Sequence, residues 1–318
     1  MTAASNATPN LRIRGVLSPV LTPFKQNLEP DVARYIAHCQ WLVSNNVGLA
    51  IFGTNSEAAS LAVTERQALL DKLLEAGVPA SRMMPGTGAC SLVDAVTLTK
   101  HAVEGGVAGC LMLPPFYFKG VSDEGLFAYY SEIIQRVASD KLKVYLYHIP
   151  AVSGVPITLN LIEMLRKNYP DTVVGVKDSS GVWDNTKAMI DNFAAGGFYV
   201  FPGSELPLSD ALAIGGVGCI SATANINPAG IHAVYAAFKA EGISEPCKAL
   251  QAKADALRKV IQAHQMISAM KRVAAEFSGQ ADWSTVRPPL VKMNEATAQT
   301  VLEQLKSIGF DMPNFSKI

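Results

Sequence analysis

Lys177 has the sequence context of a nucleophilic amine. It follows residues 172–176, an apolar run that predicts a buried strand, and precedes residues 178–181, which predict a turn. Apolar surroundings at the end of such a strand would desolvate the ammonium group and lower its pKa. The resulting free amine can attack a carbonyl carbon. The alternative is a structural lysine whose charged end reaches solvent.

Residues that could move protons follow other predicted strands. Tyr147 ends the apolar run 143–147, Thr54 lies in the turn 53–57, and Tyr117 follows a pair of prolines. Together with Lys177 they suit Schiff-base chemistry on a 2-oxo acid, with Tyr147 as proton shuttle and Thr54 and Tyr117 relaying protons outward. Backbone N–H groups of the turn could hold the substrate carboxylate. The imine is its own electron sink, so no metal or organic cofactor is expected. Taken alone, Tyr147 could also be a packed strand tyrosine.

Eight predicted strands, each followed by turn residues and separated by helical segments, would position these side chains. The strands are short apolar runs at 15–20, 48–52, 82–86, 108–113, 143–147, 173–177, 198–201 and 218–221. Eight alternating units predict an α/β protein with a (β/α)₈ TIM barrel. A doubly wound sheet is the alternative. The first strand, however, leads to Thr22-Pro23-Phe24 rather than to a glycine-rich phosphate turn.

Three helix starts and a C-terminal extension complete the predicted organisation. Residues 64–67 form a predicted capping box, Ser122 a predicted N-cap, and Asn227 an N-cap followed by Pro228. We interpret residues 1–10 as a disordered tail, 11–240 as the catalytic barrel and 241–318 as a helical extension. The helices expected in the extension span 245–264, 266–278 and 295–307.

Active sites of such barrels lie at the C-terminal ends of the strands. Lys177 is the only lysine directly at such an end, whereas Lys143 begins its strand and belongs to the opposite face. Strand alternation turns His148 and Asp178 away from the barrel interior. The sequence therefore predicts one nucleophilic lysine.

Composition argues against several classes of partner and location. The formal net charge is zero and the pI is about 7.0, without a basic stripe, so neither nucleic acid nor a membrane surface is an expected partner. No run of 18 apolar residues is present, so no transmembrane helix is expected, and the first ten residues lack a secretory signal pattern; the cytoplasmic location is expected from the odd, dispersed set of cysteines. Five dispersed cysteines predict reduced, buried thiols, and five unpaired histidines imply no protein-bound metal. A catalytic cysteine has no local support.

At these residues the chain resembles the dihydrodipicolinate synthase / N-acetylneuraminate lyase superfamily of class I aldolases. Four motifs carry the resemblance: a G-T-T-G-E-type turn at 53–57, a Y-N-x-P segment at 147–150, G-x-K at 175–177 and G-x-I-S-x-x-A-N at 218–225. The resemblance runs from about Gly15 to the C-terminal helices. It is specific because the four motifs occur together and in order.

The resemblance implies roles for individual residues. Lys177 would form the imine and Tyr147 would shuttle protons, with Thr54 and Tyr117 completing the relay. Tyr117 would reach into the site of a neighbouring subunit of a homotetramer, assembled as a dimer of dimers. Backbone groups that contact the keto acid would come from Thr54, Asn55 and Ile220.

Departures from the family pattern concern the substrate. In the dipicolinate synthases an arginine five residues after the shuttle tyrosine grips the carboxylate of the second substrate. Val152 stands there in this chain and cannot form such a pair, and no other basic residue on these loops is an obvious replacement. The stretches around Val152 and Lys177 are closer to the sialate lyases and to the aldolases of keto-deoxy-sugar acids and 4-hydroxy-2-oxoglutarate. The implied contacts to the substrate tail come from Ser153, Ser179, Glu205 and Ser221.

The sequence thus predicts a class I aldolase that cleaves a 2-keto-3-deoxy or 4-hydroxy-2-oxo acid reversibly to pyruvate and an aldehyde. Alternatives within the family are 4-hydroxy-tetrahydrodipicolinate synthase, which joins pyruvate to aspartate semialdehyde, and a dehydratase that uses the same imine. From a different class, the barrel could bind a keto acid without turnover.

Overall fold

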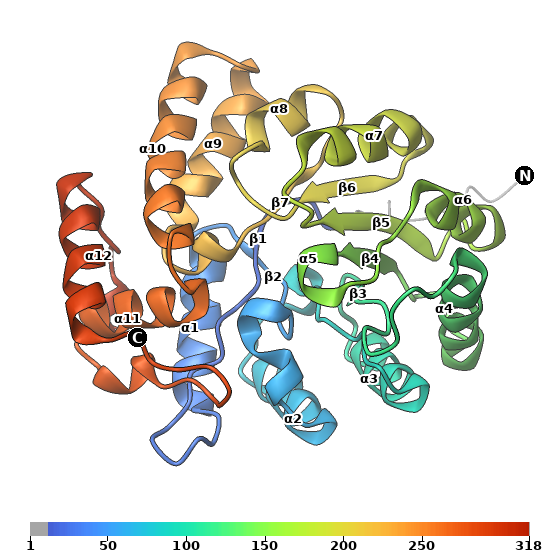
Figure 1. The fold of residues 1–318 in the computed structure, drawn as a ribbon, viewed down its shortest axis with the longest axis horizontal. Coiled ribbons are helices and arrows are strands. Elements are labelled where there is room, and N and C mark those ends of the chain that lie inside the picture. The colour runs from blue at the N-terminus through green and yellow to red at the C-terminus, as the bar shows by residue number, and fades with distance from the viewer. Residues whose placement is uncertain (1–11, 318) are drawn as a thin grey trace, which may run out of the picture.

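Parallel pairing joins the strands into a barrel in the computed structural model, which describes residues 12–317 (Figure 1). The predicted disordered tail, residues 1–10, lies outside the described residues. Strands pair in the orders β2-β1-β7 and β3-β4-β5-β6. The N–H of Val217 donates to the carbonyl of Val200 at 3.2 Å and closes the gap between β6 and β7. The strands are β1 (Gly15–Ser18), β2 (Gly48–Leu49), β3 (Cys110–Met112), β4 (Val144–His148), β5 (Val173–Asp178), β6 (Tyr199–Pro202) and β7 (Gly218–Ile220).

The third predicted strand, at 82–86, is irregular. Isolated parallel bridges pair Met83 with Leu49 and Gly86 with Leu111, so the segment occupies the place between β2 and β3. Pro85 lies within this segment and has no N–H to donate, which interrupts the ladder of hydrogen bonds. The barrel prediction is confirmed, but the prediction of eight regular strands is wrong at this segment.

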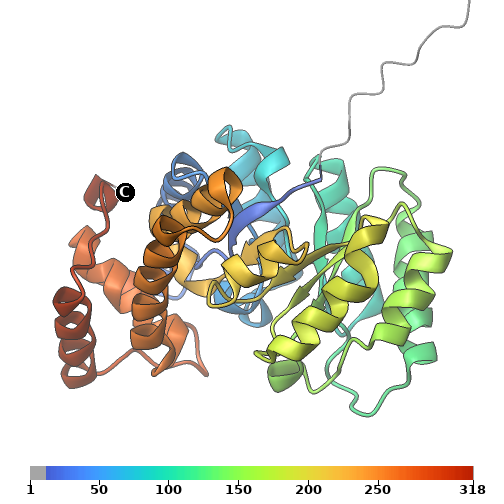
Figure 2. The same cartoon turned by 90° about the horizontal axis from the view of Figure 1, so that it is seen from above.

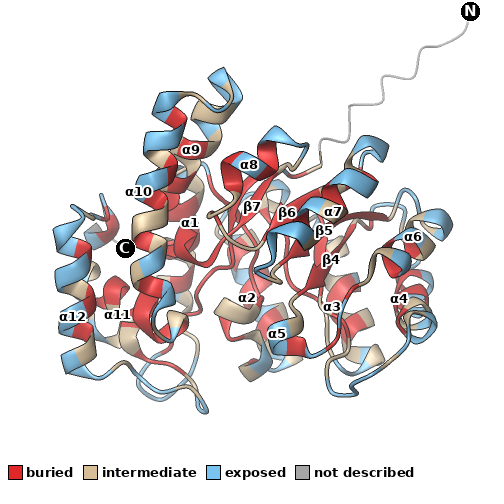
Figure 3. Cartoon of the chain, turned by 45° about the horizontal axis from the view of Figure 1, so that its top comes forward, coloured by how far each residue is buried: buried red, intermediate tan, exposed pale blue. Residues whose placement is uncertain are grey.

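Helices alternate with the strands and cover the barrel from outside, with buried inner faces and exposed outer faces (Figure 3). The predicted N-cap of α4 is confirmed, since Ser122 Oγ accepts the N–H of Gly125 at 3.2 Å. The capping box predicted at 64–67 is misplaced: α2 begins at Val63, and Glu65 accepts the N–H of Ala62 at 2.9 Å. The helices are α1 (Val32–Ser44), α2 (Val63–Glu75), α3 (Leu92–Glu104), α4 (Asp123–Val137), α5 (Pro150–Ser153), α6 (Leu159–Asn168), α7 (Trp183–Phe193), α8 (Leu208–Ala213) and α9 (Pro228–Glu241).

Three further helices follow the barrel and pack on one side of it (Figure 2). They are α10 (Glu245–Gln262), α11 (Met266–Ser278) and α12 (Glu295–Ser307), which match the predicted extension apart from a slightly earlier end of α10. Segments that follow α11 and α12 contact α1 through aromatic rings: the ring of His38 on α1 lies 5.2 Å from Trp283 and 5.9 Å from Phe315, measured between centroids. Within residues 12–317 no helix is both long enough and apolar enough to cross a membrane.

The barrel interior is filled by side chains that alternate with those facing the helices. Tyr145 lies in this interior, fully buried, and two glycines leave space for its ring. A Cβ atom on Gly175 would lie 2.5 Å from Tyr145 Cδ1, and one on Gly109 would lie 2.5 Å from Tyr145 Cε2. Contacts this short are excluded, so the glycine of the G-x-K motif is a packing requirement.

Candidate active site

Lys177 lies inside the barrel near the C-terminal end of β5. Its side chain is 2% exposed, and it pairs in register with Tyr147 of β4. The amine lies 4.2 Å from the centroid of the Tyr147 ring. Among the described residues it has no carboxylate partner and no hydrogen-bond acceptor. Lys177 is therefore a buried amine held against a phenol ring, and it does not extend to solvent.

Tyr147 and Thr54 are brought together beside this amine. Tyr147 is 4% exposed, and its hydroxyl lies 3.1 Å from Thr54 Oγ1. Thr54 starts a short 3₁₀ turn, Thr54–Ser56, just after β2. The three residues come from different parts of the barrel wall and form a contiguous amine–phenol–hydroxyl chain. The described part of the chain places Tyr117 outside this cluster: it is 76% exposed and packs edge-on against Phe118.

Internal hydrogen bonds fix the turn that carries Thr54. The N–H of Gly53 donates to Ser56 Oγ at 3.2 Å, and Thr22 Oγ1 donates to the carbonyl of Ser56 at 2.8 Å. The N–H groups of Thr54 and Asn55 find no acceptor among residues 12–317. They are free to receive a carboxylate, as the sequence predicts for this turn.

The end of the turn is strained and anchored from a distance. Glu57 adopts the left-handed conformation with φ of 56°, which is uncommon for a residue with a side chain. Its buried carboxylate accepts hydrogen bonds from Lys271 Nζ and, at 3.0 Å, from the N–H of Arg287. Lys271 lies on α11, 214 positions away in the sequence. No local pattern around Lys271 indicates this contact, and sequence reasoning missed it.

The carboxylate of Glu205 is bonded to other side chains of the protein. The side chain is fully buried, and its carboxylate accepts hydrogen bonds from the hydroxyls of Ser221 and Thr223. Arg258 of α10 forms an ion pair with it at 3.5 Å and donates to Ser221 Oγ at 3.3 Å. Glu205 and Ser221, both predicted to contact the substrate tail, are thus bonded to each other. Arg258 was not predicted, because its proximity depends on how α10 packs.

The other predicted tail residues lie apart from one another. Val152 is 65% exposed on α5, and the neighbouring Ser153 is buried, with its hydroxyl bonded to the carbonyls of Ile149 and Val155, each at 3.0 Å. Lys119 donates to the carbonyl of Ser153 at 2.5 Å. This places a cation beside Val152 that the sequence did not reveal.

Ser179 and Ile220 complete the predicted set. Ser179 is partly buried, and its N–H donates to the carbonyl of His148 at 2.7 Å. Ile220 is fully buried in the barrel interior at the end of β7.

His148 and Asp178 face away from the interior, as predicted. His148 Nδ1 accepts the N–H of Ile157 at 2.9 Å, and Asp178 accepts the hydroxyl of Thr186 at 2.5 Å. Burial lowers the pKa of His148, and the Asp178 carboxylate acts in the opposite direction. The neutral imidazole is therefore a structural acceptor rather than a member of the amine–phenol–hydroxyl chain.

The cysteines do not form an alternative nucleophilic site. Four are buried, whereas Cys90 is exposed, contrary to the expectation that all five are buried. Burial raises the pKa of the Cys110 thiol to about 12 and disfavours its thiolate. Within residues 12–317, no three His, Cys, Asp or Glu side chains are placed to share a metal ion.

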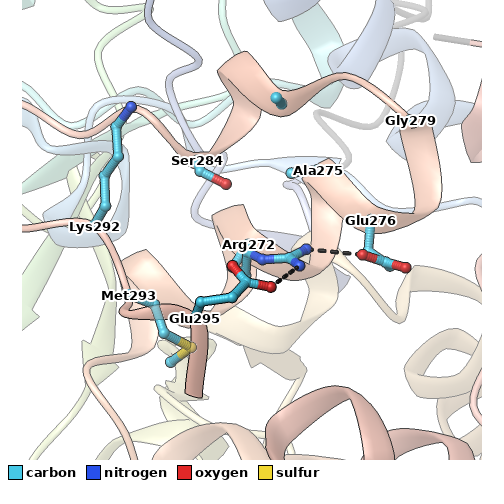
Figure 4. A pocket seen from close by; sticks show the side chains of 9 residues that line it. Arg272, Ala275, Glu276, Gly279, Ser284, Lys292, Met293 and Glu295 are labelled. Atoms are coloured by element: carbon cyan, nitrogen blue, oxygen red, sulfur yellow. Dashed lines mark hydrogen bonds and ion pairs between the residues drawn. The ribbon is translucent and has the colours of Figure 1, made fainter. Parts of the chain in front are cut away.

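A surface pocket lies in the extension, remote from this chemistry (Figure 4). Arg272 of α11 crosses it to form ion pairs with Glu276 at 2.9 Å and Glu295 at 3.2 Å. None of the predicted site residues lines this pocket.

Comparison with known proteins agrees with the geometry. The profile of the Dihydrodipicolinate synthetase family matches residues 12–308. An uncharacterized DapA-like lyase of Chloroflexus aurantiacus is 32% identical over 288 residues, which are 90% of this chain and 94% of the relative.

Two solved structures show the same architecture. Dihydrodipicolinate synthase from Agrobacterium tumefaciens str. C58 is 30% identical with a TM-score of 0.84, covering 93% of this chain and 99% of that one. Chloride-inhibited dihydrodipicolinate synthase from Acinetobacter baumannii, complexed with pyruvate, is 25% identical with a TM-score of 0.83, covering 94% and 100%. The chain belongs to the dihydrodipicolinate synthetase family and is a carbon–carbon lyase of the class I aldolase type.

Proposed function

We propose that this enzyme cleaves a 2-keto-3-deoxy or 4-hydroxy-2-oxo acid reversibly to pyruvate and an aldehyde, through an imine on Lys177. The observation that carries the proposal is the buried amine of Lys177 against Tyr147, whose hydroxyl lies 3.1 Å from Thr54. The pyruvate complex of the Acinetobacter baumannii relative supports a keto-acid ligand.

The proposed reaction begins at the Lys177 amine. It adds to the C2 carbonyl of the substrate, and loss of water gives a protonated imine. Removal of the proton from the C4 hydroxyl breaks the C3–C4 bond, whose electron pair moves into the imine to give an enamine while C4 leaves as an aldehyde. Protonation at C3 and hydrolysis of the imine release pyruvate and regenerate the amine.

Tyr147 and Thr54 serve the proton transfers in this scheme. The carbinolamine must gain a proton on its oxygen before water can leave, and a phenol beside the amine can supply it. Thr54 lies within hydrogen-bond distance of that phenol and links it to the turn. The free N–H groups of Thr54 and Asn55, together with Ile220, would hold the carboxylate end of the substrate. No metal or organic cofactor enters the scheme.

For the substrate tail we assign direct contacts to Ser179 and Ser221, with Val152 at the rim. Glu205 is fully buried and bonded to Ser221, Thr223 and Arg258, so we assign it a supporting position behind Ser221. The Ser153 hydroxyl is likewise occupied by backbone carbonyls. Hydroxyl-bearing contacts and an uncharged side chain at Val152 suit a polyol or hydroxyl tail better than a second carboxylate.

We further propose a homotetramer, a dimer of dimers, located in the cytoplasm. The exposed ring pair of Tyr117 and Phe118 supports the assembly, because large apolar side chains that protrude from a loop commonly mark an interface. Tyr117 would then complete the proton relay of a neighbouring subunit.

A second function, 4-hydroxy-tetrahydrodipicolinate synthase, is favoured by one observation. Lys119 lies against Ser153, next to Val152, and supplies a positive charge near the position of the missing arginine. Both acceptors of this ammonium are backbone carbonyls, those of Phe116 and Ser153. It would have to exchange them for a substrate carboxylate.

A panel of substrates separates these functions. The purified enzyme is assayed for pyruvate release from 2-keto-3-deoxy sugar acids and 4-hydroxy-2-oxo acids, and for condensation of pyruvate with aspartate semialdehyde. Our proposal requires pyruvate release to have the highest kcat/KM. A higher kcat/KM for condensation would establish the synthase, and loss of water from a keto-deoxy acid without pyruvate release would establish a dehydratase.

A further inference from the structure

We propose that Lys271 of the C-terminal extension is a positioning residue for catalysis, which acts through Glu57 to hold the Thr54 hydroxyl against Tyr147. The inference rests on the proposed function, because Thr54 and Tyr147 are the proton-transfer groups of that scheme. It assigns the extension a role in the chemistry of the barrel.

The ion pair between Lys271 and Glu57 is fully buried, and both oxygens of the carboxylate have hydrogen-bond donors. Both side chains are fully buried, and Lys271 Nζ donates to Glu57 Oε1 and, at 2.8 Å, to the carbonyl of Thr285. The same ammonium lies 4.4 Å from the centroid of the Phe24 ring. The second oxygen of Glu57 accepts the N–H of Arg287 at 3.0 Å. The extension therefore satisfies both oxygens of a carboxylate that belongs to the barrel.

A short path connects Glu57 to the proton shuttle. The N–H of Glu57 donates to the carbonyl of Thr54 at 3.1 Å, and Thr54 Oγ1 lies 3.1 Å from the hydroxyl of Tyr147. Glu57 also holds the left-handed conformation that ends the turn. Such a conformation persists only where surrounding contacts determine it. A change at Glu57 is thus transmitted to the position of the Thr54 hydroxyl.

Stability alone does not account for the ion pair. Burial lowers the pKa of Lys271 to about 8, although Glu57 acts in the opposite direction, so the folded protein disfavours the charged amine relative to water. Buried ion pairs replaced as a pair by uncharged groups are often neutral or stabilising. Orientation of the turn is a function that an apolar pair could not provide.

Arg272, the next residue of α11, provides a matched control. Its side chain lies in the surface pocket of the extension, where it pairs with Glu276 and Glu295 (Figure 4). Its contacts stay within the extension. Removing its charge should leave the catalytic turn unchanged.

The test compares Glu57→Gln/Lys271→Met with Arg272→Met and wild type. We expect kcat of the double variant to fall about 10–100-fold, the scale of a misplaced catalytic group, while its urea unfolding midpoint stays near that of wild type. Arg272→Met should keep kcat. In a Tyr147→Phe background, the same double substitution should cost little further activity, because its effect passes through Tyr147.

Two outcomes overturn the positioning role. One is an unchanged kcat in the folded double variant, and the other is an equal loss of kcat with and without Tyr147. If the double variant does not fold, Glu57→Asp takes its place, since it keeps the charge and retracts the carboxylate by one methylene. An unchanged kcat in Glu57→Asp would then overturn the role. Failure of the wild type to form an imine with pyruvate would refute the proposed function. That result can be told apart from the two outcomes above, because it does not involve any variant of Glu57 or Lys271.

Discussion

At the scale of single residues, the register between β4 and β5 places the two residues that we propose as nucleophile and proton shuttle. Tyr147 and Lys177 are directly paired neighbours on adjacent strands and both face the interior. Because side chains alternate, a shift of one position would turn either residue to the helix layer, where His148 and Asp178 now lie. The pair is thus held by two adjacent hydrogen-bonded strands, which suits a geometry for proton transfer.

Tyr147→Phe should lower kcat by about 10²–10⁴-fold, the usual contribution of a general acid–base group. Tyr145→Phe is the matched control on the same strand. The Tyr145 hydroxyl is buried and finds no partner among the described residues, so its removal should leave kcat unchanged. Steady-state measurement of kcat for both variants tests this prediction. Equal losses in the two variants would mean that a packing change, rather than proton transfer, explains the effect.

Residues next to strand ends were predictable, and residues from the extension were not. Lys177 and Tyr147 lie near the C-terminal ends of apolar strands, and Thr54 lies in the turn after one, so the sequence pattern places all three at one end of the barrel. Lys271 and Arg258 lie on helices in ordinary helical sequence. Their partners Glu57 and Glu205 depend on the docking of α10 and α11 on the barrel, which no local pattern reveals.

At the scale of elements, strand packing explains the glycine of the G-x-K motif. Gly175→Ala should destabilise the protein by about 1–3 kcal/mol, because the new methyl would lie 2.5 Å from the Tyr145 ring and 2.6 Å from the carbonyl of Tyr199. Gly125→Ala on α4 should instead stabilise it by about 0.5–1 kcal/mol, since the nearest atom is 3.8 Å away and alanine favours helix. Urea unfolding measures both free energies. Equal stability of the two variants would contradict this account of packing.

Element boundaries show where local patterns fail. The helices of the extension were predicted within about two residues of their observed bounds, and the start of α4 from the Ser122 cap. The segment at 82–86 has the composition of a strand, yet Pro85 limits it to isolated bridges. At the start of α2, Glu65 accepts the backbone N–H of Ala62. Alanine is not a typical N-cap residue, so the sequence does not indicate that the helix begins there.

At the scale of the whole molecule, a buried histidine joins the barrel to the extension. His38 of α1 packs against Trp283 and Phe315, and its Nε2 lies 3.1 Å from Asn225 Oδ1. The Asn225 side-chain amide nitrogen donates to the carbonyls of Pro19 and Ala222, so Oδ1 is the acceptor and Nε2 carries the proton. Burial lowers the pKa of His38 to about 4, and the hydrogen bond to Asn225 opposes the shift only partly.

This histidine predicts an acid-dependent loss of stability. Below pH 6.5 the unfolded chain binds a proton that folded His38 excludes until about pH 4, so the free energy of unfolding falls as pH falls through that window. The loss from His38 is about 3 kcal/mol, at about 1.4 kcal/mol per pKa unit. His38→Gln keeps a donor for Asn225 and lacks the titration. Urea unfolding at pH 7, 5 and 4 should show wild type losing about 3 kcal/mol more than the variant. Parallel pH curves for the two proteins would contradict the assignment.

The central claim is an imine between Lys177 and a 2-oxo acid, and reductive trapping tests it most directly. Wild type and Lys177→Met are incubated with pyruvate and sodium borohydride, digested and examined by peptide mass spectrometry. The account predicts one reduced pyruvate adduct in wild type, on the peptide that contains Lys177, and none in Lys177→Met. An adduct on another lysine, or an unmodified wild-type chain under conditions of turnover, would contradict it.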